Sequence, residues 1–214
     1  MSLALFDLDG TLVDRQSAFV DAVAAFCQAH RFGPEIEAWL LAELADRANA
    51  ADFSRLRQAF TLTEPATELW QAYGHCIAGA VSCRPTVVEG VARLRAVGWT
   101  VGIVTNGASD IQRAKLAATG LVGLVDGVAV SGDHEIRKPD PRLFELAASR
   151  CGVSLADGGW MVGDNPAGDI GGGHRVGLST IWLRGRPWPD GLPAADHVVG
   201  DVTDAITILL AETE

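Results

Sequence analysis

Short apolar runs alternate with helical patterns along most of the chain, and one long helical stretch interrupts them near the start. Leu3-Ala4-Leu5-Phe6 is a continuous apolar run, which predicts a short buried strand. Between Asp14 and Cys83, apolar side chains recur at helical spacing and no strand pattern occurs. This stretch therefore predicts a small unit of four helices, inserted directly after the first strand.

Beyond Arg84-Pro85 the pattern changes, and strands are predicted in alternation with helices. The further predicted strands are Thr100–Val104, Val128–Val130, Trp160–Val162, Thr180–Leu183 and His197–Val199. Such alternation is typical of a parallel sheet with helices on both faces. We therefore predict an α/β core domain of residues 1–14 and 84–214, with an all-helical cap domain of residues 15–83 inserted after strand one.

Composition narrows the class of protein. The 214 residues are 48% apolar, enough for a packed core, and 17 basic against 27 acidic side chains give a net charge of −10. An acidic chain is a poor match for nucleic acid or an anionic membrane, so neither partner is expected. No leader pattern and no membrane-length apolar run occur, and the four cysteines form no metal-binding spacing. We therefore expect a cytoplasmic location; the sequence leaves the oligomeric state open.

The first predicted strand ends in two carboxylates, Asp7 and Asp9, followed by Gly10. Open α/β sheets bind their ligands at the carboxyl ends of strands. Two anionic groups this close repel each other unless they share a cation or a proton, and carboxylate oxygens suit Mg²⁺. An ordinary polar turn is the alternative that these residues alone leave open.

Three later strand ends also carry polar groups, which makes coincidence improbable. Thr105-Asn106-Gly107 follows the second strand, where a hydroxyl and free backbone N–H groups can hold a phosphate oxygen. Lys138 lies in the loop after the third strand, and Asp164 and Asp169 follow the fourth. An acid pair, a Thr-Asn pair, a lysine and a second acid pair thus occur at four separate strand ends.

These motifs resemble those of the haloacid dehalogenase-like hydrolase superfamily. The matching residues are Asp7-x-Asp9-Gly-Thr, Thr105-Asn106-Gly107, Lys138-Pro139-Asp140-Pro141 and Gly163-Asp164-(x4)-Asp169. The helical insertion is similar to the helical cap of the subfamily that includes phosphoglycolate phosphatase-like enzymes. The resemblance implies a three-layer Rossmann-like core and a Mg²⁺-dependent phosphatase acting on a small phosphorylated metabolite.

The resemblance also implies a role for each motif residue. Asp7 would be the nucleophile and form an aspartyl-phosphate, while Asp9 would act as general acid and base. Mg²⁺ would be held by Asp7, by the Asp9 backbone carbonyl and by Asp164. The remaining roles are substrate binding by Thr105 and Asn106, charge compensation by Lys138, and orientation of Lys138 or a metal-bound water by Asp169.

Position 9 and the lysines discriminate between reactions within this superfamily. The superfamily's dehalogenases lack an aspartate two residues after the nucleophile, so Asp9 favours phosphate chemistry. Phosphonate cleavage and sugar-phosphate mutases in the superfamily use a cap lysine, and before Gly120 the chain has only Lys115, which we assign to a core helix. A phosphatase is therefore predicted, with a phosphomutase or a non-catalytic phosphate- or Mg²⁺-binding regulatory protein as the alternatives.

Substrate choice is expected to depend on the cap, because the core motifs would contact only the phosphoryl group. Four cap arginines are candidates to reach an anionic leaving group: Arg15, Arg47, Arg55 and Arg57. For any one of them, a solvated position on a helix surface is the alternative. The sequence does not distinguish phosphoglycolate from a sugar phosphate or a nucleoside monophosphate.

Overall fold

A parallel sheet of six strands forms the α/β part of the protein in the computed structural model, which describes residues 2–212. The strands are β1 (Leu3–Phe6), β2 (Thr100–Thr105), β3 (Gly127–Val130), β4 (Trp160–Gly163), β5 (Ser179–Leu183) and β6 (His197–Val199). Their spatial order is β3-β2-β1-β4-β5-β6, so β1 lies between β2 and β4. The predicted α/β parallel sheet is confirmed, and the strand ends that carry the motifs lie side by side.

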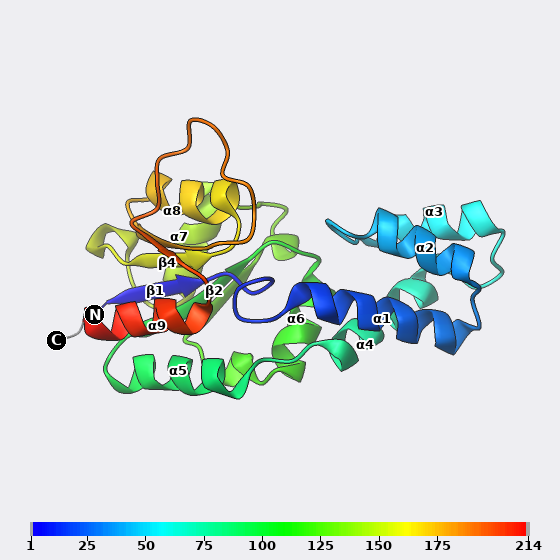
Figure 1. Ribbon diagram of the computed structural model, residues 1–214, viewed down its shortest axis with the longest axis horizontal. Helices are drawn as coiled ribbons and strands as arrows, with labels where there is room; N and C mark the ends of the chain where they lie inside the picture. The colour runs from blue at the N-terminus through cyan, green and yellow to red at the C-terminus, as the bar shows by residue number, and fades with distance from the viewer. Residues whose placement is uncertain (1, 213–214) are drawn as a thin grey trace. The chain divides into compact units, whose positions relative to one another are not determined.

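Helices cover both faces of this sheet and give three layers (Figure 1). One face carries α7 (Pro141–Arg150) and α8 (Gly171–Arg175), and the other carries α5 (Pro85–Ala96) and α9 (Val202–Ala211). Side chains alternate between the faces of a strand, so Leu3 and Leu5 pack together on the α7 side with Phe144 and Met161. Both faces of β1 are buried, as a central parallel strand requires.

A turn of π type at Pro166–Ile170 and then α8 follow β4, where the sequence predicts one weak helix over residues 170–176. Gly172 and Gly173 lower the helix propensity of this segment, but close packing requires glycine at both positions. A side chain at Gly172 would come within 2.5 Å of the Phe144 ring, and one at Gly173 within 3.0 Å of Met161. Without side chains at these positions, α8 packs closely on α7 and the sheet. Short 3-10 turns occur at Leu121–Gly123, Ser131–Asp133 and Leu155–Asp157.

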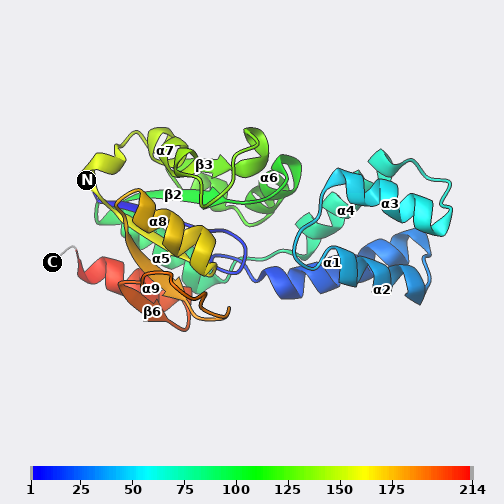
Figure 2. The same ribbon diagram turned by 90° about the horizontal axis from the view of Figure 1, so that it is seen from above.

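The second compact unit is helical and consists of residues 14–82 and 107–119. It contains α1 (Arg15–His30), α2 (Pro34–Glu43), α3 (Ala50–Phe60) and α4 (Ala66–Ala80), which Figure 2 shows together. It also contains α6 (Ser109–Ala118). Aromatic rings dominate its core: the Phe53 ring lies 5.9 Å from Phe26, 5.5 Å from Trp70 and 5.2 Å from Tyr73, measured between centroids. Among residues 2–212, no helix is both long and apolar enough to cross a membrane.

Helix α6 differs from the sequence prediction, which places Lys115 on a helix of the core domain. The Trp70 indole N–H donates to the Asp110 carboxylate at 2.6 Å, and Ile111 belongs to the apolar core of the helical unit. These contacts group α6, and Lys115 with it, with α1 to α4. The α/β unit accordingly consists of residues 1–13, 83–106 and 120–214. The division into domains of residues 1–14 with 84–214 and 15–83 stays a prediction.

Candidate active site

The chain turns sharply immediately after β1, and this turn carries the first acid pair. Asp7 follows the last residue of β1, and its backbone N–H donates to the Val162 carbonyl of β4 at 2.9 Å. Residues 8–13 then fold back, with the amides of Leu12 and Val13 donating to the Leu8 carbonyl. Gly10 has a φ of +79°, which glycine adopts without strain. The Asp7 side chain is buried at the strand end, and Asp9 is half-buried in the turn.

Lys138 is the buried cation of the site. Its ammonium group lies 2.7 Å from Asp7 Oδ1 and 2.7 Å from Asp169 Oδ1, and it donates to the Val104 carbonyl at 2.7 Å. An ammonium group has three N–H donors, so these three acceptors use all of them. Asp7 and Asp169, which come from two different strand ends, are therefore held on one lysine.

Asn106 fixes the backbone that carries this lysine. Its amide nitrogen donates to the Lys138 carbonyl at 3.1 Å, and its amide oxygen accepts from the Lys138 N–H at 2.9 Å. No sequence motif predicts this side-chain contact, because the two residues are 32 positions apart. Thr105, the last residue of β2, directly precedes Asn106 in the chain and is fully buried.

Asp169 is fully buried and is held by the turn that follows β4. Its Oδ2 accepts from the Asn165 N–H at 2.9 Å, while Asn165 Oδ1 accepts from the Gly168 N–H at 2.8 Å. A side chain on Gly163 would come within 2.1 Å of Asp169 Oδ2. Only glycine at position 163 leaves the space that this carboxylate occupies.

Asp164 contacts both the first turn and a later loop. A side chain on Gly10 would lie 2.8 Å from Asp164 Oδ2, so the turn after β1 abuts this carboxylate. Asp164 Oδ2 accepts from Arg186 Nε at 2.8 Å, and the Asp164 carbonyl accepts from the Trp182 indole at 3.1 Å. Arg186 lies outside the four sequence motifs. Its position just after the end of β5, at the sheet edge that carries the other motifs, is the signal that could have found it.

Burial and mutual repulsion perturb the carboxyl groups. Burial raises the pKa of Asp7 to about 7; the charges of Asp169 and Asp164 act in the same direction, and Lys138 opposes them. Burial likewise raises the pKa of Asp169. Burial alone would lower the pKa of Lys138, but Asp169 and Asp7 outweigh it and raise that pKa. The lysine thus stays charged, and a further cation close to Asp7 would favour the ionised form of that carboxyl group.

The donor set fits a hard divalent cation. Carboxylate oxygens of Asp7, Asp164 and Asp169 all lie within 4.8 Å of one another. Asp164 Oδ1 is buried and has no hydrogen-bond partner among residues 2–212. Closely spaced carboxylate oxygens, one of them without a proton donor, match the oxygen ligands that Mg²⁺ takes. These residues are therefore able to hold such an ion.

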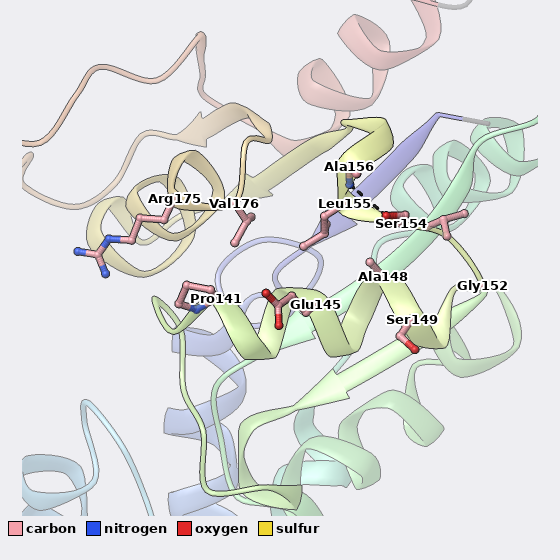
Figure 3. A pocket seen from close by; sticks show the side chains of 11 residues that line it. Pro141, Glu145, Ala148, Ser149, Gly152, Ser154, Leu155, Ala156, Arg175 and Val176 are labelled. Atoms are coloured by element: carbon pink, nitrogen blue, oxygen red, sulfur yellow. Dashed lines mark hydrogen bonds between the residues drawn. The ribbon is translucent and has the colours of Figure 1, made fainter.

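A separate groove of about 630 Å³ lies on the α7 side of the α/β unit (Figure 3). Its lining comes from α7, from the 3-10 turn at Leu155–Asp157 and from the end of α8, and it includes Glu145 and Arg175. None of the motif carboxylates lines it. The groove is thus distinct from the acid cluster.

Two of the four candidate arginines make contacts inside the helical unit. Arg55 forms ion pairs with Glu43 at 2.8 Å and with Asp52 at 2.9 Å, and its guanidinium lies 5.7 Å from the centre of the Trp39 ring. Arg15 donates to the Ala45 carbonyl. In this structure, both arginines therefore have partners within the helical unit itself.

Comparison with known proteins identifies the family to which the chain belongs. The family model for haloacid dehalogenase-like hydrolases matches residues 1–177, so the chain belongs to the haloacid dehalogenase-like hydrolase family. The predicted membership is confirmed. The structure is also similar to solved members of the family over nearly its whole length.

Individual relatives include enzymes of two kinds. The chain is 38% identical over 123 residues to a phosphoserine phosphatase from Thermus thermophilus, a match covering 57% of this chain and 48% of that protein. A HAD phosphatase structure from Thermococcus onnurineus has a TM-score of 0.69 and 27% identity, over 98% of each chain. A 2-haloacid dehalogenase structure from Pseudomonas syringae pv. Tomato also has a TM-score of 0.69 and 27% identity, over 100% of each chain. The chain spans about half the length of the first curated relatives that it matches.

Proposed function

We propose that the protein is a Mg²⁺-dependent phosphatase that hydrolyses a small phosphate monoester. The observation that carries this proposal is the cluster of Asp7, Asp164 and Asp169 with the buried Lys138. Attack by a carboxylate on a carbon–halogen bond requires one such group, and the added carboxylates would only raise the cost of burial. In phosphoryl transfer, by contrast, the added carboxylates would bind a divalent cation that offsets the charge of the phosphoryl group.

The proposed reaction proceeds in two steps. An oxygen of the Asp7 carboxylate attacks phosphorus, the bond from phosphorus to the ester oxygen breaks, and Asp9 gives its proton to the departing alkoxide. Asp9 then takes a proton from water, whose oxygen attacks the aspartyl-phosphate. The bond between Asp7 and phosphorus breaks, which releases inorganic phosphate and restores the Asp7 carboxylate.

The other residues would hold and balance the reacting groups. Lys138 would offset the charge of Asp7 during attack, and Asp169 would keep the lysine in place. Thr105 and the Asn106 backbone would bind phosphoryl oxygens, in keeping with their position at the end of β2. When bound by Asp7, Asp164 and the Asp9 carbonyl, Mg²⁺ would reduce the repulsion between the phosphate dianion and the nucleophile.

Hydrolysis of p-nitrophenyl phosphate tests this proposal. Wild-type protein should release phosphate with Mg²⁺ and lose that activity in EDTA, while Asp7→Asn and Asp9→Asn should each lose about 10³-fold or more in kcat/KM. Asp14→Asn is the matched control. Asp14 caps α1 by accepting from the amides of Gln16 and Ser17, a role that asparagine fills equally well, so this variant should keep full activity.

A second assay separates the phosphatase from a dehalogenase with the same fold. Wild-type protein should release no chloride from 2-chloropropionate in EDTA. Chloride release there, or phosphate release by Asp7→Asn equal to that of the wild type, would contradict the proposal. A phosphoryl adduct on Asp7, found by mass spectrometry after an acid quench, would support the covalent step. A screen of metabolite phosphates would then define the substrate class.

A further inference from the structure

Arg186 is a second cation at the acid cluster, and it is held differently from Lys138. The Lys138 side chain is 3% exposed, whereas that of Arg186 is 47% exposed. Its Nε lies 2.8 Å from Asp164 Oδ2, and the nearby charges of Asp164, Asp169 and Asp7 all favour its charged form. The exposed guanidinium therefore neutralises part of a carboxylate cluster that the lysine alone does not balance.

The loop that carries Arg186 is anchored on both sides of it. Trp182 donates to the Asp164 carbonyl at 3.1 Å, and the Trp182 and Trp188 rings pack edge to face with 4.7 Å between centroids. Trp188 in turn donates to the Leu192 carbonyl at 3.2 Å. With these anchors in place, the flexible side chain of Arg186 can leave Asp164 while the backbone keeps its position.

Charge counting shows what the departure of Arg186 would do. Asp7, Asp164 and Asp169 with Lys138 and Arg186 sum to −3 + 2 = −1 when every group is ionised. Without Arg186 the sum is −2, which one divalent cation balances. A guanidinium on one oxygen of Asp164 and a divalent cation on the other would repel each other at short range. The two cations therefore disfavour each other at Asp164.

We infer that Arg186 is a built-in counter-cation of Asp164, which competes with the divalent metal ion and is displaced when that ion binds. This inference rests on the metal site in the proposed function. Arg186 is then a positioning residue: it holds Asp164 in place in the metal-free protein and weakens the affinity for metal. Removal of a residue that merely supports the loop would leave metal binding unchanged or weaken it.

Titration of the full chain with Mg²⁺ by calorimetry, at constant ionic strength, tests the inference. Arg186→Ala should bind Mg²⁺ about three- to tenfold more tightly than the wild type, as expected for the loss of a partly exposed competing charge. Arg186→Lys, which keeps the charge but loses the planar fork, should fall between the two. The matched control is Arg184→Ala, an exposed arginine on the same loop, which should change the affinity less than twofold.

Thermal unfolding gives an independent readout. The increase in Tm on adding Mg²⁺ should be larger for Arg186→Ala than for the wild type, because tighter binding to the folded state raises stability more. Unchanged or weaker Mg²⁺ affinity in Arg186→Ala would overturn the inference, as would equal tightening in Arg184→Ala. Absence of Mg²⁺ binding in both wild type and Arg186→Ala would overturn the proposed metal site as well. Binding by the wild type with no gain in the variant overturns only the role of Arg186.

Discussion

The strand ends of the α/β unit and the core of the helical unit use burial in opposite ways. At the strand ends, Asp7, Asp169 and Lys138 lie buried as charged or chargeable groups. In the helical unit, a large apolar core of aromatic and aliphatic side chains dominates, and the buried Asp52 is paired with Arg55, whose side chain is exposed. Burial of charge costs free energy, whereas burial of aromatic rings supplies it.

Because of this difference, we expect the strand ends to serve reactivity and the helical core to serve stability. A charged cluster in which burial raises the pKa of Asp7 is a poor source of stability but a suitable setting for chemistry. The helical unit, with its interlocking rings, has the opposite character. Substitutions in the two places should therefore have different signatures, and three measurements examine that expectation.

Replacement of Lys138 should have the largest effect. Lys138→Met leaves Asp7 and Asp169 buried without their shared cation, so we expect at least about 10³-fold loss of phosphatase activity and about 3–5 kcal/mol loss of stability. The control is Lys115→Met, because Lys115 and Lys138 are each 7% exposed when the whole residue is counted, but Lys115 lies on α6 of the helical unit. Activity assays and urea unfolding measure both quantities. Retained activity in Lys138→Met would remove the distinction between the two regions.

Phe53→Ala tests how much the aromatic core of the helical unit contributes to stability. Phe53 is fully buried among Phe26, Trp70 and Tyr73, so its truncation should lower the free energy of unfolding by about 3–5 kcal/mol. The Mg²⁺ affinity of the folded protein should stay within twofold of the wild type. Phe53→Leu, which keeps most of the volume, should cost less than half as much. A large change in Mg²⁺ affinity would show that the helical core also shapes the acid cluster.

The pH dependence of stability should show the cost of the buried charge directly. In EDTA, folded Asp7 has a pKa raised to about 7 from 3.8, so between these values the folded protein holds a proton that the unfolded chain has released. The free energy of unfolding should therefore fall as pH rises from about 4 to about 7, by on the order of 3 kcal/mol. Asp7→Asn should lack this component in urea titrations. An equal pH dependence in the variant would place the titrating group elsewhere.

Hydrophobic patterning predicts most of the fold. Every predicted strand is present within a residue or so of its expected limits, because buried parallel strands are short apolar runs that turn residues bound. The placement of α6 could not be predicted, since its apolar face is equally able to cover a sheet or a helix. The hydrogen bond from Trp70 to Asp110 decides the matter, and these residues are 40 positions apart.

The site was predictable where motifs are local and unpredictable where contacts are long-range. Asp7, Lys138, Asp164 and Asp169 follow from their positions at strand ends, and the structure brings all four together. The bracing of Lys138 by the Asn106 side chain and the contact of Arg186 with Asp164 depend on loop conformations that no sequence period encodes. The catalytic, substrate-binding and metal-binding roles assigned to these residues, and to Asp9 and Thr105, stay predictions.

The three contacts of the Lys138 ammonium also limit how a phosphoryl group can use it. Asp7, Asp169 and the Val104 carbonyl surround the nitrogen, so each of the three N–H groups already has an acceptor. An incoming oxygen would have to share a hydrogen that already points elsewhere, so in the proposed reaction the lysine would act on it chiefly as a fixed electrostatic centre. Arginine at this position would place a planar guanidinium where three acceptors surround a single nitrogen. It would restore the charge without restoring the geometry.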